Sequence, residues 1–253
     1  MNTTPTTLLL QRAIESACDG SVKQYLVNSS KSSSQINERT LRNGFSDLRS
    51  QASRSSALPH AFEMIRQLNG YYRTRYAIEK LRALTPMIYS AIEARNWWRS
   101  GPPNIADAAP SDIDSLASVV PSILHDAEKD GLDRPYSLIT KFLHFSFQDS
   151  FGIYDAQAAN SIQTWGYFTF ELGNPEGKAF LWGGIANVNG NGYRAIIDFY
   201  RILWLHGSEE QLRRLELAAH DLTLEIQAPV SSTYIVDNLL WQGNGDPRVL
   251  GLL

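Results

Sequence analysis

The stretch that decides the fold is Lys141-Phe-Leu-His-Phe-Ser-Phe-Gln-Asp-Ser-Phe-Gly-Ile-Tyr-Asp155. Its first residues continue a helical pattern of apolar side chains, and Gly152 marks a turn before a second helix that begins at Asp155. The segment therefore places one lysine and one aspartate at the two ends of an otherwise apolar helix and turn. We take this pairing as the starting point for both fold and function.

The chemistry of this pairing follows from the surroundings of Lys141. Of the three lysines beyond residue 101, it alone lies inside a strongly hydrophobic segment. Burial disfavours the charged form of an amine, and a neutral lysine is a nucleophile. A nearby carboxylate accepts its proton or stabilises a developing cation. The alternative is that Lys141 extends its stem along an apolar face and reaches water, and that Asp155 only caps a helix.

The composition is that of a soluble globular protein. The chain has 253 residues, of which 43% are hydrophobic and 19% charged, and no stretch is long enough to cross a membrane. A single cysteine, Cys18, excludes an internal disulfide, so we expect a reducing, cytoplasmic setting. The five histidines are scattered without metal-ligand spacing, so we expect neither a metal site nor a cofactor.

The charges are unevenly distributed along the chain. Residues 1–101 hold 14 Lys/Arg against 7 Asp/Glu, whereas residues 102–253 hold 9 against 19. The excess of basic residues predicts a surface in the N-terminal part that binds a polyanion. The alternative is that the two parts neutralise each other.

Hydrophobic periodicity predicts a mostly α-helical fold with almost no strand pattern. We divide the chain into an N-terminal helical region, 1–105, with a basic Ser/Arg-rich loop, and a core, 106–253, and expect one compact unit. The predicted helices are 1–30, 37–49, 61–82, one that begins at Pro86 and passes Trp98, 111–129 capped by Ser111, one from Ser137, one from Asp155, 193–206, one capped by Ser208, and 231–241; residues 172–193 are predicted to be a loop.

The break, helix, turn and helix around residues 131–165 resemble the catalytic core of the helix-hairpin-helix DNA glycosylases. The resemblance rests on Ser137-Leu-Ile-Thr-Lys141-Phe-Leu-His-Phe and Phe151-Gly-Ile-Tyr-Asp155. The closing segment Thr233-Tyr-Ile-Val-Asp-Asn-Leu-Leu-Trp-Gln-Gly243 is similar to the last helix of the bacterial branch with an 8-oxoguanine glycosylase-like fold. The resemblance covers about residues 110–245 and leaves the N-terminal helical extension without a counterpart.

The resemblance implies excision of a damaged or modified base from double-stranded DNA, with the target nucleotide rotated out of the duplex. Lys141 is then the nucleophile that attacks the sugar, and Asp155 assists it. A Schiff base formed in this way also allows strand cleavage by a lyase step. The setting is either repair or defence against invading DNA, and no obligatory protein partner is evident.

Further candidate residues come from position in the sequence. Side chains near the pair that suit a base pocket are His144, Tyr154, Trp165 and Trp182. Candidates for contacts with the DNA backbone are Arg39, Arg42, Arg49, Arg54, Arg134 and Ser137. Basic side chains among short polar ones suit phosphate contacts, which fix register without reading sequence.

The alternative hypothesis is a catalytically silent module that binds DNA or a protein. The segment before Lys141 reads Arg134-Pro-Tyr-Ser-Leu-Ile-Thr140, without the glycine-rich hairpin that is usual in the family. Close backbone approach to a phosphate favours glycine. A ribonuclease-like toxin and a glycoside hydrolase with paired carboxylates are weaker alternatives, because the residues that these chemistries use are not grouped here.

Overall fold

The structure is a computed structural model that describes residues 5–32, 37–50, 54–133, 135–154, 156–171 and 192–243. Within these ranges every regular element is an α-helix, which confirms the predicted helical class. The helices are α1 (Pro5–Cys18), α2 (Ser21–Ser30), α3 (Glu38–Ser50), α4 (Arg54–Tyr71), α5 (Ile78–Glu93), α6 (Trp97–Ser100), α7 (Pro110–Lys129), α8 (Tyr136–Ser146), α9 (Ala156–Glu171), α11 (Gly192–His206), α12 (Glu209–Ile226) and α13 (Ser232–Trp241).

Side-chain caps explain where several helices begin. The Ser208 hydroxyl accepts a hydrogen bond from the Gln211 amide at the start of α12 (3.2 Å), as predicted. The Ser231 hydroxyl does the same for the Tyr234 amide at the start of α13 (3.1 Å). A short polar side chain before a helix satisfies one of its free amides, which stabilises the helix by about 1 kcal/mol.

The predicted helix over residues 1–30 is two helices, α1 and α2, separated at Gly20. A Cβ at Gly20 would lie 2.7 Å from the Ser16 Cα, so the chain turns where only glycine fits. The Ser16 hydroxyl then accepts a hydrogen bond from the Val22 amide at 3.0 Å. This hydrogen bond gives the Val22 amide a partner in place of the helical hydrogen bond that the break removes.

The predicted helix over residues 61–82 is wrong, because α4 begins at Arg54 and ends at Tyr71, and α5 begins at Ile78. Two further predicted helix starts, both at or next to a proline, are also wrong. Pro86 lies inside α5 instead of opening a helix, because packing of α5 against α4 and α7 outweighs the cost of a lost backbone bond. Pro110, not Ser111, begins α7, with Ala109 at the capping position. The Asp112 carboxylate accepts a hydrogen bond from the Ala109 amide at 3.2 Å, and proline suits a first helical position.

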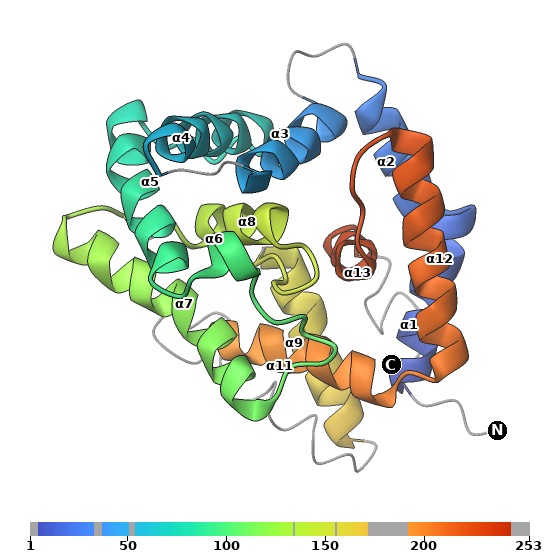
Figure 1. Ribbon diagram of the computed structural model, residues 1–253. Coiled ribbons are helices and arrows are strands. Elements are labelled where there is room, and N and C mark those ends of the chain that lie inside the picture. The colour runs from blue at the N-terminus through green and yellow to red at the C-terminus, as the bar shows by residue number, and fades with distance from the viewer. Residues whose placement is uncertain are drawn as a thin grey trace.

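The helices share one hydrophobic core. Figure 1 shows α8, α9 and α13 in the middle, with α3 to α5 above them, α7 to one side, and α1, α2 and α12 to the other. Helices α3 and α4 pack on α8, and α1 packs on α12 and α13. The predicted boundary at residue 105 therefore does not separate two cores.

Candidate functional site

Helix α8 holds Lys141 away from solvent. Almost every residue of this helix is buried, and Lys141 is only 5% exposed. Its Nζ donates a hydrogen bond to the Ser137 hydroxyl, one helical turn earlier, at 2.5 Å. The same nitrogen lies 4.9 Å from the centre of the Tyr72 ring. The predicted burial of this amine is confirmed, and its stem does not simply lead to open water.

Lys141 opens onto a small cavity in the middle of the molecule. The cavity measures about 30 Å³, which is room for about one water molecule. Its walls come from α2, the turn after α4, α8, the segment before α9, α9 itself and α13. The lining residues are Tyr25, Tyr72, Lys141, Ile153, Ala158, Tyr234, Asp237, Asn238 and Trp241.

Asp237 is the carboxylate among these lining residues. It is 4% exposed, and its Oδ2 accepts a hydrogen bond from the Ile153 amide at 3.0 Å. Its Oδ1 accepts one from the Tyr200 hydroxyl. These donors hold the carboxylate in a fixed orientation on the wall that it shares with Lys141. The sequence analysis assigned no role to Asp237.

The backbone that presents Ile153 depends on Gly152. A Cβ at this glycine would lie 2.3 Å from a ring carbon of Tyr200, so the aromatic ring occupies the space of a side chain. The Tyr193 hydroxyl donates a hydrogen bond to the Gly152 carbonyl at 3.0 Å. The glycine that the sequence marked as a turn thus allows Tyr200 to approach and reach Asp237.

His144 supports the site from inside the core and is not among the residues that line the cavity. It is fully buried, and its Nδ1 lies 2.5 Å from the Phe151 carbonyl oxygen and 3.4 Å from the Asp237 Oδ2. Burial, together with the neighbouring Arg42 and Lys141 side chains, lowers the pKa of His144 to about 3, although the hydrogen bond to the Phe151 carbonyl opposes this shift. A neutral ring that donates from Nδ1 positions the Phe151 carbonyl. The prediction that His144 lines a base pocket is corrected accordingly.

Tyr154 and Trp165, two other predicted pocket residues, do not line the cavity either. Tyr154 packs its ring against Tyr136 at 4.1 Å between ring centres, and Trp165 is 2% exposed inside the core. Trp182 and Asp155 lie outside the described residues. Ile153 and Ala158, which precede and follow Asp155, both line the cavity.

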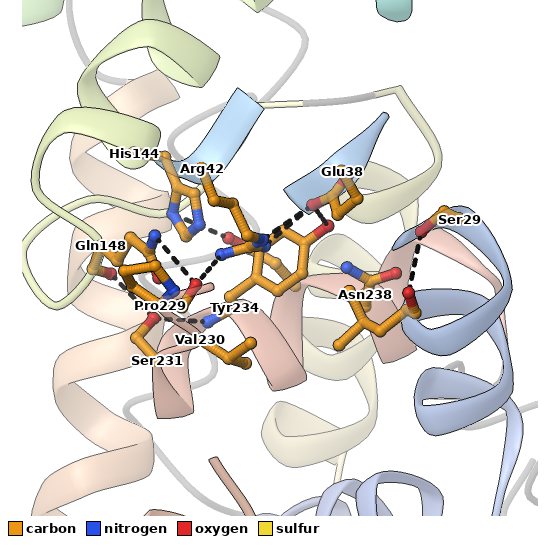
Figure 2. A network of polar contacts seen from close by, with 12 residues as sticks. Ser29, Glu38, Arg42, His144, Gln148, Pro229, Val230, Ser231, Tyr234 and Asn238 are labelled. Atoms are coloured by element: carbon orange, nitrogen blue, oxygen red, sulfur yellow. Dashed lines mark hydrogen bonds and ion pairs between the residues drawn. The ribbon is translucent and has the colours of Figure 1, made fainter. Parts of the chain in front are cut away.

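A buried ion pair adjoins the cavity (Figure 2). The Arg42 Nε donates to the Glu38 Oε1 at 3.0 Å, and the Tyr234 hydroxyl donates to the same oxygen at 2.6 Å. The Arg42 Nη1 donates to the Pro229 carbonyl at 2.7 Å, and its guanidinium lies 3.7 Å from the centre of the Tyr234 ring. This network fixes Tyr234, which is a wall of the cavity.

The electrostatics of this pair favour a charged arginine. Burial lowers the pKa of Arg42, but Tyr234 and Glu38 outweigh burial and leave that pKa above its usual value. Burial also raises the pKa of Tyr234 well above its usual value, so the phenol stays protonated and donates to Glu38. The prediction that Arg42 contacts a DNA backbone is wrong, because its side chain is fully buried.

The remaining residues that were predicted to contact the DNA backbone differ in exposure. Arg39 and Arg49 are exposed; Arg39 reaches Gln227 at 3.5 Å, and Arg49 lies 5.4 Å from the Phe147 ring centre. Ser137 is half-buried and accepts the Lys141 hydrogen bond. Arg134 and the Arg54 side chain lie outside the described residues. Two of the six candidates are thus placed on the described surface.

None of the four aromatic residues that line the cavity was predicted from the sequence. Tyr25 and Tyr72 come from the N-terminal region and have no sequence signal that links them to Lys141. Tyr234 and Trp241 lie seven residues apart on α13 with Asp237 between them, and this spacing places all three on one helix face. A search for polar and aromatic residues sharing that face would have found them.

The described part of the chain contains no group of three or more His, Cys, Asp or Glu side chains that could bind a metal ion. Among the same residues, no helix combines the length and apolar character needed to cross a membrane. Comparisons with protein-family models, curated proteins and solved structures gave no match.

Proposed function

We propose that the chain is a DNA glycosylase that uses Lys141 as its nucleophile. The observation that carries the proposal is a buried amine on the wall of a cavity whose other walls include four aromatic side chains and a carboxylate. Burial disfavours the charged form of an amine and so favours the nucleophilic form. Aromatic faces suit a planar base, and stacking of this kind contributes about 1–3 kcal/mol per base.

The proposed reaction begins when the Lys141 nitrogen attacks C1′ of the flipped nucleotide. A C–N bond forms to the lysine, the glycosidic bond breaks, and its electron pair leaves with the base. The lysine proton passes to a carboxylate, for which the sequence resemblance proposes Asp155. Opening of the sugar ring then gives a Schiff base, from which β-elimination cleaves the strand on the 3′ side.

The cavity must enlarge before a base can enter, because its present volume fits about one water molecule. Trp241 is the lining residue best placed to move, since it is 39% exposed at the end of α13. Its ring packs on Tyr25 at 5.6 Å between centres. We propose that separation of these two rings admits the base from solvent.

The second candidate function is a silent module that binds DNA or a protein without chemistry. The small volume of the cavity favours this candidate, because the cavity has room for about one water molecule and not for a base. The two functions differ in one property: only the glycosylase releases a base or cleaves the strand in a reaction that depends on Lys141.

A panel of duplexes, each with one modified base, tests the proposal by measuring base release and strand cleavage. We expect the wild type to cleave at least one duplex and Lys141→Ala to reduce that rate by at least 100-fold. Lys129→Ala, on the exposed surface of α7, is the matched control and should retain the wild-type rate. Equal rates for Lys141→Ala and the control would contradict the proposal.

A further inference from the structure

The turn between α4 and α5, residues 72–77, holds two arginines in an unusual backbone conformation. Arg73 has a φ of 52° and Arg75 a φ of 63°. This left-handed region is uncommon for residues other than glycine, and such residues persist only where the surroundings fix them. Arg73 and Arg75 lie two positions apart, whereas the other described non-glycine examples, Asn96 and Gln227, are isolated.

One side chain, Asn69 at the end of α4, fixes this turn. Its Oδ1 accepts hydrogen bonds from the Thr74 hydroxyl at 2.6 Å and from the Tyr76 amide at 2.9 Å. Its Nδ2 donates to the Tyr76 carbonyl at 3.1 Å, and its backbone carbonyl accepts from the Thr74 amide at 3.1 Å. The turn is therefore a preformed loop that presents two arginines.

Both arginine side chains are exposed, and neither forms a hydrogen bond or an ion pair with any residue that the structure describes. Two basic residues on the adjoining helices differ in this respect. Arg66 on α4 pairs with Glu63 at 2.6 Å, and Lys80 on α5 pairs with Asp133. The positive charge of the turn is thus not neutralised by the described part of the protein.

The turn begins at the cavity. Tyr72, which immediately precedes Arg73, lines the cavity, and its ring faces the Lys141 nitrogen. Consecutive Cα atoms are about 3.8 Å apart, so the Cα of Arg73 lies one such step from the Cα of Tyr72, and the Cα of Arg75 lies at most about three such steps from it. An anion held by these arginines would lie beside the substrate of Lys141.

We propose that Arg73 and Arg75 bind two phosphodiester groups of the DNA strand beside the nucleotide that enters the cavity. This inference rests on the proposed function, because it assigns the backbone contacts of the same site. The guanidinium fork matches two phosphate oxygens, and a preformed turn loses little conformational freedom on binding. The two arginines position the strand and take no part in the chemical step.

The salt dependence of DNA binding tests this assignment directly. The probe is a duplex with one central tetrahydrofuran abasic-site analogue, and the readout is the slope of log Kobs against log salt concentration. That slope is negative and each lost phosphate contact reduces its magnitude by about 0.9, so Arg73→Gln/Arg75→Gln should reduce the magnitude by about 1.8. Arg73→Lys/Arg75→Lys keeps both charges and should retain the slope while binding more weakly.

The matched control is Arg12→Gln/Arg66→Gln, which removes the same charge from two exposed arginines already paired with Glu15 and Glu63. It should change the slope by clearly less than the turn variant. An equal change in both variants, or no change in either, would overturn the assignment. A wild type that does not bind the duplex would also overturn it.

Two further measurements distinguish binding to a DNA strand from binding to other anions, and DNA binding from the chemical step. If the arginine turn were needed for binding phosphatidylglycerol vesicles or inorganic phosphate but not the duplex, the assignment to a DNA strand would be overturned. Lys141→Ala should keep the wild-type slope. A slope that depends on the arginines in a protein without base cleavage would support this inference while contradicting the proposed function.

Discussion

The Lys141 amine and the Glu38–Arg42 pair are ionisable groups in a largely apolar interior, and each has identifiable partners. Lys141 contacts the Ser137 hydroxyl and the Tyr72 ring, whereas Arg42 contacts a carboxylate, a carbonyl and an aromatic face. This difference in surroundings is the basis for proposing Lys141, and not Arg42, as the reactive group. Arg42 is enclosed by the protein, but Lys141 adjoins an empty volume.

His144 gives a prediction about the pH dependence of stability. Its pKa is about 3 in the folded protein against an ordinary 6.5, so the unfolded chain binds one more proton between these values. Its contribution to stability is complete above pH 6.5 and is lost as pH falls toward 3. In that window it adds about 1.4 kcal/mol per pH unit to the slope of the unfolding free energy.

The variant that tests this contribution is His144→Asn, whose amide keeps a donor near the position of Nδ1. Urea unfolding measured from pH 6.5 to pH 4 should show a slope one proton smaller than that of the wild type. The same exchange at the exposed His206 is the control. A slope unchanged by His144→Asn would mean that the imidazole is protonated in the folded state.

The helices themselves could be predicted from the sequence to different degrees. Helices α3, α8, α11, α12 and α13 lie close to their predicted positions because apolar periodicity is a local signal, and α3, α12 and α13 also have asparagine or serine caps. Helices α1, α2, α4 and α5 have limits that differ from the prediction. The break at Gly20 depends on a close contact with Ser16 that helical periodicity does not reveal, and the continuation of α5 through Pro86 depends on tertiary packing.

The candidate site shows the same division between local and long-range information. Lys141 stands out because its own helix is apolar. Tyr25 and Tyr72 reach the cavity only because α2 and α4 pack around α8 and α13, and sequence separation hides that contact. Arg42 looks like a surface residue in a polar, serine-rich stretch, but α3 buries it against Tyr234.

The attachment of α3 to α8 and α13 should depend strongly on the Glu38–Arg42 pair. Arg42→Met would leave a buried carboxylate without its cation and should lower the unfolding free energy by about 3–5 kcal/mol. Adding Glu38→Gln removes that charge while still accepting the Tyr234 hydrogen bond, so the double variant should recover a large part of the loss. Chemical denaturation measures both changes.

Arg39→Met is the matched control on the same helix, because Arg39 is exposed. It should change the unfolding free energy by no more than about 0.5 kcal/mol. A double variant no more stable than Arg42→Met would contradict the view that an unpaired Glu38 is the source of the loss.

At the scale of the whole molecule, the N-terminal helices complete the core and supply two walls of the cavity. We therefore expect the chain to unfold in one cooperative transition, because no helix group has a separate core. Far-UV circular dichroism and tryptophan fluorescence should give coincident midpoints in urea. Two separated midpoints would instead indicate that regions 1–105 and 106–253 unfold independently.

Borohydride trapping followed by peptide mapping tests the central claim most directly. The wild-type protein is incubated with the modified duplex that it cleaves, or with abasic DNA, and the Schiff base is reduced to a stable adduct. The account predicts a protein–DNA adduct attached to Lys141 that Lys141→Ala does not form. An adduct at another residue, or none on any substrate, would contradict it.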